Sequence, residues 1–157
     1  MSLELNKLSV ITSQGHKLFA PVDLVIAKGE VACLMGPSGV GKSTLLNAIG
    51  GHLSSDFRVA GKLMLNAIEV THMPVAERHI GILFQDPLLF PHLNVGDNLA
   101  FGLKAKVGDA KQRRRLVDQA LEQAQLSDFY HRNPQTLSGG QQSRVALMRA
   151  LLAQPQA

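Results

Sequence analysis

Eight consecutive residues in the first third of the chain match the pattern G-x-x-x-x-G-K-[ST]. They are Gly36, Pro37, Ser38, Gly39, Val40, Gly41, Lys42 and Ser43. Glycines allow positive φ and a close approach to an anion, so that successive amide N–H groups can point at phosphate oxygens. Lys42 supplies a mobile positive charge for the β and γ phosphates, and the Ser43 hydroxyl can ligate Mg²⁺. The motif therefore predicts binding of a nucleoside triphosphate.

The segments on both sides of this motif have the composition that such a loop needs. Residues 31–35 are unbroken and apolar, which predicts a strand covered on both faces. Residues 43–49 predict a helix that ends at Gly50 and Gly51. The free N–H groups and the positive dipole end of that helix favour a bound phosphate.

Composition limits the class of protein. The chain has 157 residues, 45% hydrophobic and 18% charged, which suits one folded domain with an aliphatic core, because only 4% are aromatic. The single cysteine, Cys33, excludes an internal disulfide framework. The formal net charge of +4 permits an anionic partner without requiring one. The apolar runs are much shorter than the roughly 20 residues that a membrane-spanning helix needs.

Hydrophobic periodicity changes character along the chain. Residues 22–26 and 61–66 alternate as half-buried strands do, and residues 80–84 resemble a second buried strand. Beyond Pro91 the pattern becomes helical, with helices expected over residues 95–103, 113–126 and 141–152. The sequence therefore predicts a β and α/β core interrupted by a mostly helical portion.

A second candidate site opens the last of these helices. It consists of Leu137, Ser138, Gly139, Gly140 and Gln141. Two glycines expose the backbone, a serine offers a hydroxyl, and the helix N–H groups face outward, as at an anion site. Taken alone, the same residues fit an ordinary helix start equally well.

Together these motifs resemble those of the nucleotide-binding subunits of ABC transporters, over essentially the whole chain and most closely in the bacterial import type. Residues 36–44, including Thr44, are similar to the Walker A loop, and residues 137–151 to the family signature. Residues 82–95 resemble the Q-loop segment, with Gln85 at the key position.

The resemblance implies a P-loop NTPase core of α/β class. Its mixed sheet has an N-terminal antiparallel β part, and a helical subdomain precedes the signature. Within one ABC ATPase domain over residues 1–157, we expect the core at 1–89, the helical subdomain at 90–137 and the signature helix at 138–157.

The resemblance also implies a mechanism and partners. Two copies would enclose ATP and Mg²⁺, with the Walker A loop of one facing Ser138, Gly139, Gly140 and Gln141 of the other. Ser43 and Gln85 would ligate Mg²⁺, and Gln85 would also sense Mg²⁺ or the attacking water. The expected partners are a second ATPase subunit and a transmembrane permease, without nucleic acid, at the cytoplasmic face of the cell membrane.

The sequence departs from the family pattern in two respects. No apolar run ends in the Walker B aspartate and catalytic glutamate, so we expect no catalytic residue in this chain and poor hydrolysis by it alone. We interpret the chain as an incomplete form of a longer ATPase. In the family, the adenine stacks on an aromatic residue upstream of the Walker A loop. In this chain the only aromatic side chain among residues 11–17 is His16, and Phe19 is expected in a strand.

Two other functions share parts of the pattern. A nucleoside monophosphate kinase has a similar phosphate loop, although the β-rich residues upstream and the signature disfavour it. A DNA-associated ABC-type ATPase would need a coiled coil or zinc modules, for which Lys42 and Ser138 lie too close and one cysteine is too few. A basic cluster fits a solvated helix face or contact with anionic lipid or nucleic acid. Its members are Lys104, Lys106, Lys111, Arg113, Arg114 and Arg115.

Overall fold

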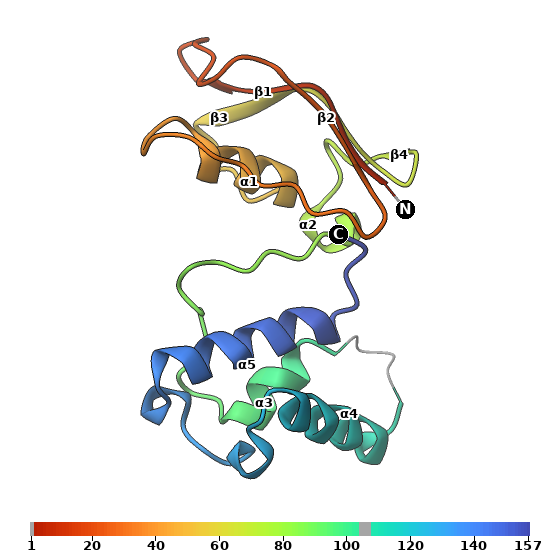
Figure 1. Cartoon of the computed structure of the whole chain (residues 1–157), viewed down its shortest axis with the longest axis vertical. Coiled ribbons are helices and arrows are strands. Elements are labelled where there is room, and N and C mark those ends of the chain that lie inside the picture. The colour runs from red at the N-terminus through yellow and green to blue at the C-terminus, as the bar shows by residue number, and fades with distance from the viewer. Residues whose placement is uncertain (1, 104–107) are drawn as a thin grey trace. The chain divides into compact units, whose positions relative to one another are not determined.

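The computed structural model describes residues 2–103 and 108–157. The chain divides into two compact units, Met1–Ile80 with Gln156–Ala157, and Gly81–Pro155. The first unit contains the strands and the second is helical, as Figure 1 shows.

The first unit is built on a four-stranded sheet in the order β2-β1-β3-β4. All of its strand pairs are antiparallel. The strands are β1 (Ser2–Thr12), β2 (Val22–Ala27), β3 (Phe57–Leu65) and β4 (Ile68–Glu69). Two helices, α1 (Lys42–Gly50) and α2 (Val75–Arg78), belong to the same unit. The helix and strand predicted at residues 43–49 and 61–66 are thus confirmed.

An aliphatic core joins the sheet to α1. Leu5, Leu8 and Leu63 are at most 1% exposed and cluster with Leu45, the buried residue of the first turn of α1. Leu5 pairs with Leu63 across β1 and β3, and an irregularity in β1 between Leu5 and Leu8 brings Leu8 into the same core, because strict alternation would place residues three apart on opposite faces. Because α1 packs against this core, the sheet determines where the start of α1 lies.

The second unit packs three helices around one core. They are α3 (Val95–Phe101), α4 (Ala110–Gln123) and α5 (Gly139–Leu152), with short 3-10 segments η1 (Ser127–Phe129) and η2 (Pro134–Thr136) between the last two. In α4 the apolar side chains of Val117, Ala120 and Leu121 are buried, and Val145 of α5 is fully buried. The three helices predicted from the periodicity are confirmed.

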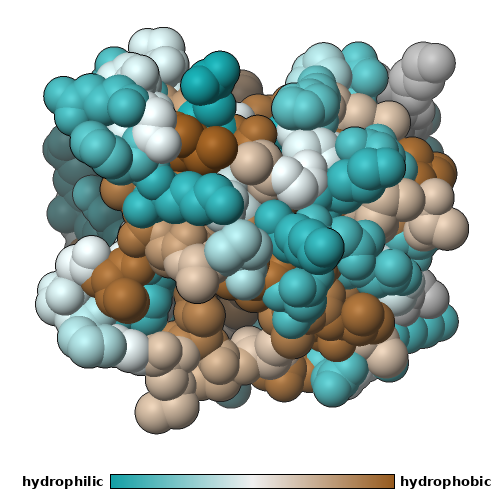
Figure 2. Space-filling view, turned by 90° about the horizontal axis from the view of Figure 1, so that it is seen from above, coloured by the Kyte–Doolittle hydropathy of each residue, from teal (hydrophilic) through white to brown (hydrophobic). Residues whose placement is uncertain are grey.

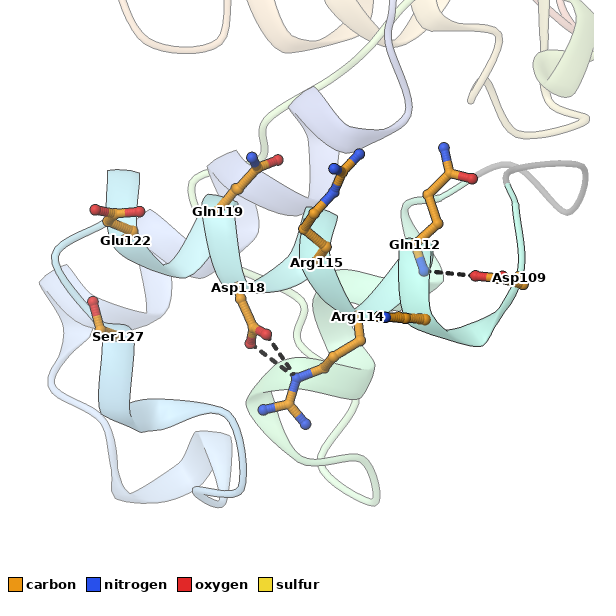
Figure 3. Close-up of a pocket in the computed structure, with 9 residues that line it drawn as sticks. Asp109, Gln112, Arg114, Arg115, Asp118, Gln119, Glu122 and Ser127 are labelled. Atoms are coloured by element: carbon orange, nitrogen blue, oxygen red, sulfur yellow. Dashed lines mark hydrogen bonds and ion pairs between the residues drawn. The ribbon is translucent and has the colours of Figure 1, made fainter.

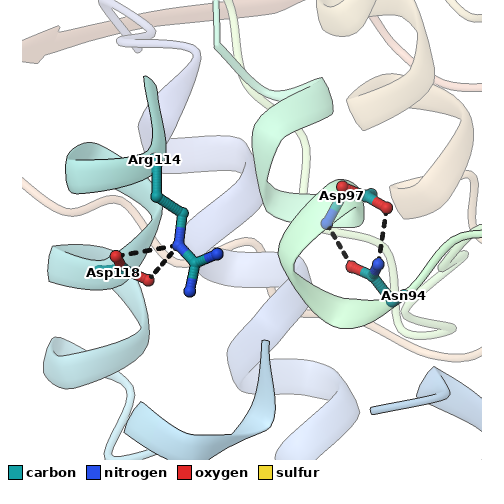
Figure 4. A network of polar contacts seen from close by, with 4 residues as sticks. All are labelled: Asn94, Asp97, Arg114 and Asp118. Atoms are coloured by element: carbon teal, nitrogen blue, oxygen red, sulfur yellow. Dashed lines mark hydrogen bonds and ion pairs between the residues drawn. The ribbon is translucent and has the colours of Figure 1, made fainter. Parts of the chain in front are cut away.

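Side chains at the N-caps define where these helices begin. Asn94 accepts a hydrogen bond from the Asp97 N–H and donates its own amide to the Asp97 carboxylate (Figure 4). Asp109 accepts from the Gln112 N–H at 2.8 Å (Figure 3). Such caps satisfy donors that the first helical turn leaves unpaired.

Residues 31–35 do not form the buried strand that their composition predicts, and neither do residues 80–84. Val31 is 91% exposed and Met35 is 84% exposed. The physical reason is the absence of backbone partners, since no described strand pairs with either segment. Figure 2 shows hydrophobic patches interspersed with hydrophilic ones on the surface.

The longest helices, α4 and α5, have 14 residues each. In residues 2–103 and 108–157, no helix combines the length and apolar character needed to cross a bilayer.

Leu121→Ala tests the core of the second unit. Leu121 is completely buried, so we expect loss of about 3 kcal/mol of unfolding free energy from lost burial and the cavity left behind. The exposed Gln119→Ala on the same helix should change stability by less than about 0.5 kcal/mol. Urea unfolding followed by circular dichroism measures both, and equal effects would contradict this packing.

Candidate nucleotide-binding site

The phosphate loop lies in the first unit and leads directly into α1 (Figure 1). Gly36, Gly39 and Gly41 have φ values of 155°, 83° and 99°. Gly41 is the N-cap of α1 and no side chain caps this end. The N–H groups of the first turn therefore remain available to an anion, as expected from the motif.

Lys42 folds back across this loop. Its Nζ donates hydrogen bonds to the carbonyl oxygens of Gly36 and Pro37, each at 2.6 Å. The ammonium group thus lies against the backbone that is proposed to surround a phosphate. Phosphate oxygens compete well for these donors, because hydrogen bonds between ionised partners are stronger than those to neutral carbonyls.

Ser43 is exposed in the first turn of α1, and none of the described residues hydrogen-bonds its hydroxyl. Hydroxyl, phosphate and water oxygens suit the ligand preference of Mg²⁺. In the described part of the chain, His, Cys, Asp and Glu form no group of three or more that could hold a metal. The exposed Ser43 hydroxyl fits a magnesium ion that takes most of its other ligands from phosphate and water.

Phe19 is a neighbour of the loop that the sequence did not reveal. It lies in the bend between β1 and β2 rather than in a strand, so the expectation of a strand residue was wrong. A Cβ atom built on Gly41 would lie 2.8 Å from Cδ1 of the Phe19 ring. The ring thus packs directly on the glycine that begins α1, at a distance that leaves no room for a side chain.

Gln85 belongs to the second unit and is exposed. The segment that follows it is held by side chains from two helices. Asn98 of α3, which is fully buried, accepts from the Phe90 N–H at 2.8 Å and donates to the carbonyls of Phe90 and Leu93. These bonds satisfy backbone groups of a segment without regular structure.

Arg149 of α5 holds the same segment. Its guanidinium donates to the carbonyls of Leu88 at 3.0 Å and Pro87 at 3.1 Å, and lies 5.3 Å from the centre of the Phe90 ring. Desolvation lowers the pKa of Arg149, which still leaves the group charged at neutral pH because arginine starts so high. Neither Asn98 nor Arg149 was identified from sequence, since their acceptors are backbone atoms that no motif records.

Ser138 is the N-cap of α5 and takes part in a capping box. Its hydroxyl accepts from the Gln141 N–H at 3.4 Å, and the Gln141 side chain accepts from the Ser138 N–H at 2.9 Å. Gly139 and Gly140 are exposed, and a Cβ at either would meet no atom within 4 Å. The start of this helix is therefore both well capped and open for close approach.

Within the second unit the segment after Gln85 and the signature region lie together. A cavity of about 290 Å³ is lined by residues of both: Asp86, Pro87, Leu88, Leu89, Pro91, Pro134, Gln135 and Gln142. Gln142 donates to the carbonyls of Pro134 and Leu137, which ties the signature turn to η2. The phosphate loop belongs to the first unit, whereas every residue that lines this cavity belongs to the second.

Three residues of the basic cluster line a different, open hollow of about 940 Å³ on α4, namely Lys111, Arg114 and Arg115 (Figure 3). Arg114 pairs with Asp118 at 2.9 Å (Figure 4). The guanidinium carbon of Arg114 also lies 3.6 Å from the centre of the Tyr130 ring. Arg113 donates to the Ala100 carbonyl at 3.0 Å. Lys104 and Lys106 lie outside the described residues. Internal contacts thus occupy Arg113 and Arg114, and the same hollow is also lined by the acidic Asp109, Asp118 and Glu122.

Residues 19–157 match the family model described as ABC transporter. The chain belongs to the ABC transporter family. The match includes the phosphate loop, Gln85 and the signature, and neither the nucleoside monophosphate kinase nor the DNA-associated ATPase is supported by these similarities.

Curated relatives within this family are transporter ATP-binding proteins. The uncharacterized ABC transporter ATP-binding protein YnjD of Escherichia coli (strain K12) is 49% identical over 142 residues, covering 90% of this chain and 64% of YnjD. The spermidine/putrescine import ATP-binding protein PotA of Salmonella typhimurium is 42% identical, covering 90% of this chain and 36% of PotA. A putative 2-aminoethylphosphonate import ATP-binding protein, PhnT, of the same organism is 40% identical, covering 92% and 38%. The chain therefore spans less than two thirds of each of these relatives.

Solved ABC cassettes share the fold. The dimeric post-hydrolysis structure of the ATP-binding cassette MJ0796, bound to ADP and Pi, superposes with a TM-score of 0.81 at 31% identity. That alignment covers 98% of this chain and 70% of the cassette. A second dimeric structure of MJ0796 aligns equally well. The expected α/β P-loop NTPase fold class is thereby confirmed.

Gly41→Ala tests the contact between Phe19 and the phosphate loop. Positive φ and the close ring together should cost about 2–3 kcal/mol of unfolding free energy. Gly39→Ala is the matched control, because it has positive φ but no neighbour within 4 Å, and should cost about 1 kcal/mol. Urea unfolding measures the difference. Adding Phe19→Ala should reduce the cost of Gly41→Ala, and an unchanged cost would show that the ring is irrelevant.

Proposed function

We propose that this chain is the ATP-binding part of an ABC transporter, and that ATP with Mg²⁺ binds at the phosphate loop. The observation that carries the proposal is the backbone of this loop, with three positive-φ glycines and the Lys42 ammonium at the uncapped start of α1. The similar cassette MJ0796 holds ADP and Pi. ATP hydrolysis by the whole protein would then power transport.

The proposed roles follow from the chemistry of each side chain. The backbone of the loop surrounds the phosphates, Lys42 neutralises them, and Ser43 ligates Mg²⁺. Gln85 reports on the metal or the attacking water. The nucleotide-binding set is Gly36, Pro37, Ser38, Gly39, Val40, Gly41, Lys42, Ser43, Thr44 and Gln85. We assign no catalytic base to the residues of this chain.

We further propose that two copies of the protein enclose the nucleotide. Ser138, Gly139, Gly140 and Gln141 of one copy would face the phosphates bound by the other. The exposed glycines at the start of α5 and its outward N–H groups support this role, because an anion is favoured at a helix N-terminus. The related cassette MJ0796 is dimeric in its structures.

A transmembrane permease is the second proposed partner, which would hold the protein at the inner face of the cell membrane. The direction of transport that we favour is import, because the relatives PotA and PhnT carry import in their names. We assign residues 1–89 to the ATPase core, 90–137 to the helical subdomain and 138–157 to the signature helix.

Lys42→Ala tests nucleotide binding. Removing the only side-chain cation of the loop should weaken ATP binding at least tenfold, because the phosphates lose a charge-assisted donor. Lys28→Ala, which removes an exposed lysine from a turn of the same unit, should leave affinity unchanged. Titration with a fluorescent ATP analogue measures both dissociation constants. Equal affinities for the two variants would contradict a phosphate role for this loop.

Ser138→Asp separates the capping role of Ser138 from contact with phosphate. Aspartate caps a helix as well as serine does, whereas Ser138→Ala should lose about 1 kcal/mol of unfolding free energy. A carboxylate facing a triphosphate should abolish ATP-dependent dimers, which analytical ultracentrifugation detects. If Ser138→Asp dimerises with ATP as the natural protein does, this residue does not face the nucleotide.

A further inference from the structure

Arg78 is a buried cation that none of the motifs accounts for. It is the last residue of α2 and is only 6% exposed. Among the described residues no carboxylate pairs with it, and its guanidinium is instead surrounded by backbone carbonyls. A buried charge without such partners would be costly, so this arrangement requires all of its acceptors to stay in place.

Two of these acceptors lie at the C-terminal end of α1. Nη1 donates to the carbonyls of Ala48 at 2.9 Å and Ile49 at 3.0 Å. The last carbonyls of a helix have no partner within it and carry its negative partial charge. Arg78 therefore caps α1 at the end opposite the phosphate loop with two charge-assisted hydrogen bonds.

The other acceptors connect this cap to the sheet. Nη2 donates to the Thr71 carbonyl at 2.7 Å and Nε to the Met73 carbonyl at 2.9 Å. The Thr71 hydroxyl accepts from the Leu63 N–H of β3 at 2.9 Å. One guanidinium thus joins the end of α1 to the turn that follows β4 and, through Thr71, to β3.

Gly51 provides the space for this guanidinium. It is the C-cap of α1 with a φ of 83°, and a Cβ there would lie 2.9 Å from both Cζ and Nε of Arg78. A glycine at position 51 therefore leaves the room that the Arg78 guanidinium occupies. Burial lowers the pKa of Arg78 by desolvation, and it remains charged at neutral pH.

We infer that Arg78 is a positioning residue for the phosphate loop. Helix α1 has nine residues, a rod of about 14 Å, with the phosphate donors at its start and the Arg78 cap at its end. Because α1 is short and Leu45 in its first turn contacts the sheet, loosening the cap lets the helix tilt about that contact, which reorients the N–H groups of the first turn and Lys42 relative to the phosphates. This inference rests on the proposed binding of ATP at that loop.

A purely structural role would have a different signature. Arg78 would then contribute to unfolding free energy, as any buried residue does, without affecting the dissociation constant of the folded protein for ATP. Val10→Ala supplies the comparison, because Val10 is fully buried in β1 but lies outside the apolar cluster that contains Leu45 of α1. It should lower stability without changing the start of α1.

The experiment compares ATP affinity with stability in Arg78→Met, Arg78→Lys and Val10→Ala. We expect the dissociation constant for a fluorescent ATP analogue to rise at least tenfold in Arg78→Met and less in Arg78→Lys, which keeps a charge and some donors. Val10→Ala should bind as the natural protein does at a temperature where all variants are folded. Natural affinity in Arg78→Met, despite lower stability, would overturn the inference.

Hydrogen exchange tests, without nucleotide, whether Arg78 holds α1 in place. In Arg78→Met, or in Gly51→Ala if the former does not fold, amides of α1 should lose protection more than those of β1 and β3. Equal loss across the unit would overturn the positioning role. If the natural protein and Lys42→Ala bind ATP equally poorly, the proposed function fails, whereas exchange at α1 still tests the Arg78 cap.

Discussion

The polarity of one short helix underlies the chemistry of the first unit. Helix α1 begins with donors that no side chain caps, at the glycine-rich loop, and ends with carbonyls that need a donor. The Arg78 guanidinium satisfies the end of this dipole, and a phosphate group bound as proposed would satisfy its start. Leu45 anchors the first turn of this helix to the apolar face of the sheet.

In the second unit, side chains of two helices hold an irregular segment in place. Residues 86–93 lack helix or strand pairing, so their carbonyls require other partners. The buried amide of Asn98 and the guanidinium of Arg149 supply them from α3 and α5. Because α5 also carries the signature at its N-terminus, a displacement of α5 would move Arg149 and therefore the segment after Gln85.

Local patterns predicted most of the regular structure. Helices α1, α3, α4 and α5 lie close to the ranges that hydrophobic periodicity predicts, because periodicity depends on neighbouring residues alone. The segments at 31–35 and 80–84 did not follow their composition. An apolar run indicates a preference for burial, but a strand requires a partner that supplies backbone hydrogen bonds, and the described strands supply none there.

The sequence by itself predicted the kind of site: the spacing of glycines, Lys42 and Ser43 predicts a phosphate loop, and the phosphate-loop motif, Gln85 and the signature together indicate the family, which the comparisons confirm. Only the tertiary structure revealed the contacts that support these motifs: the Phe19 ring on Gly41, the Arg78 cap on α1 and the hydrogen bonds of Arg149 to the segment after Gln85. The physical reason is that a motif is read from adjacent side chains, whereas these supports act on backbone atoms or glycines distant in sequence, whose identity leaves no trace of the contact.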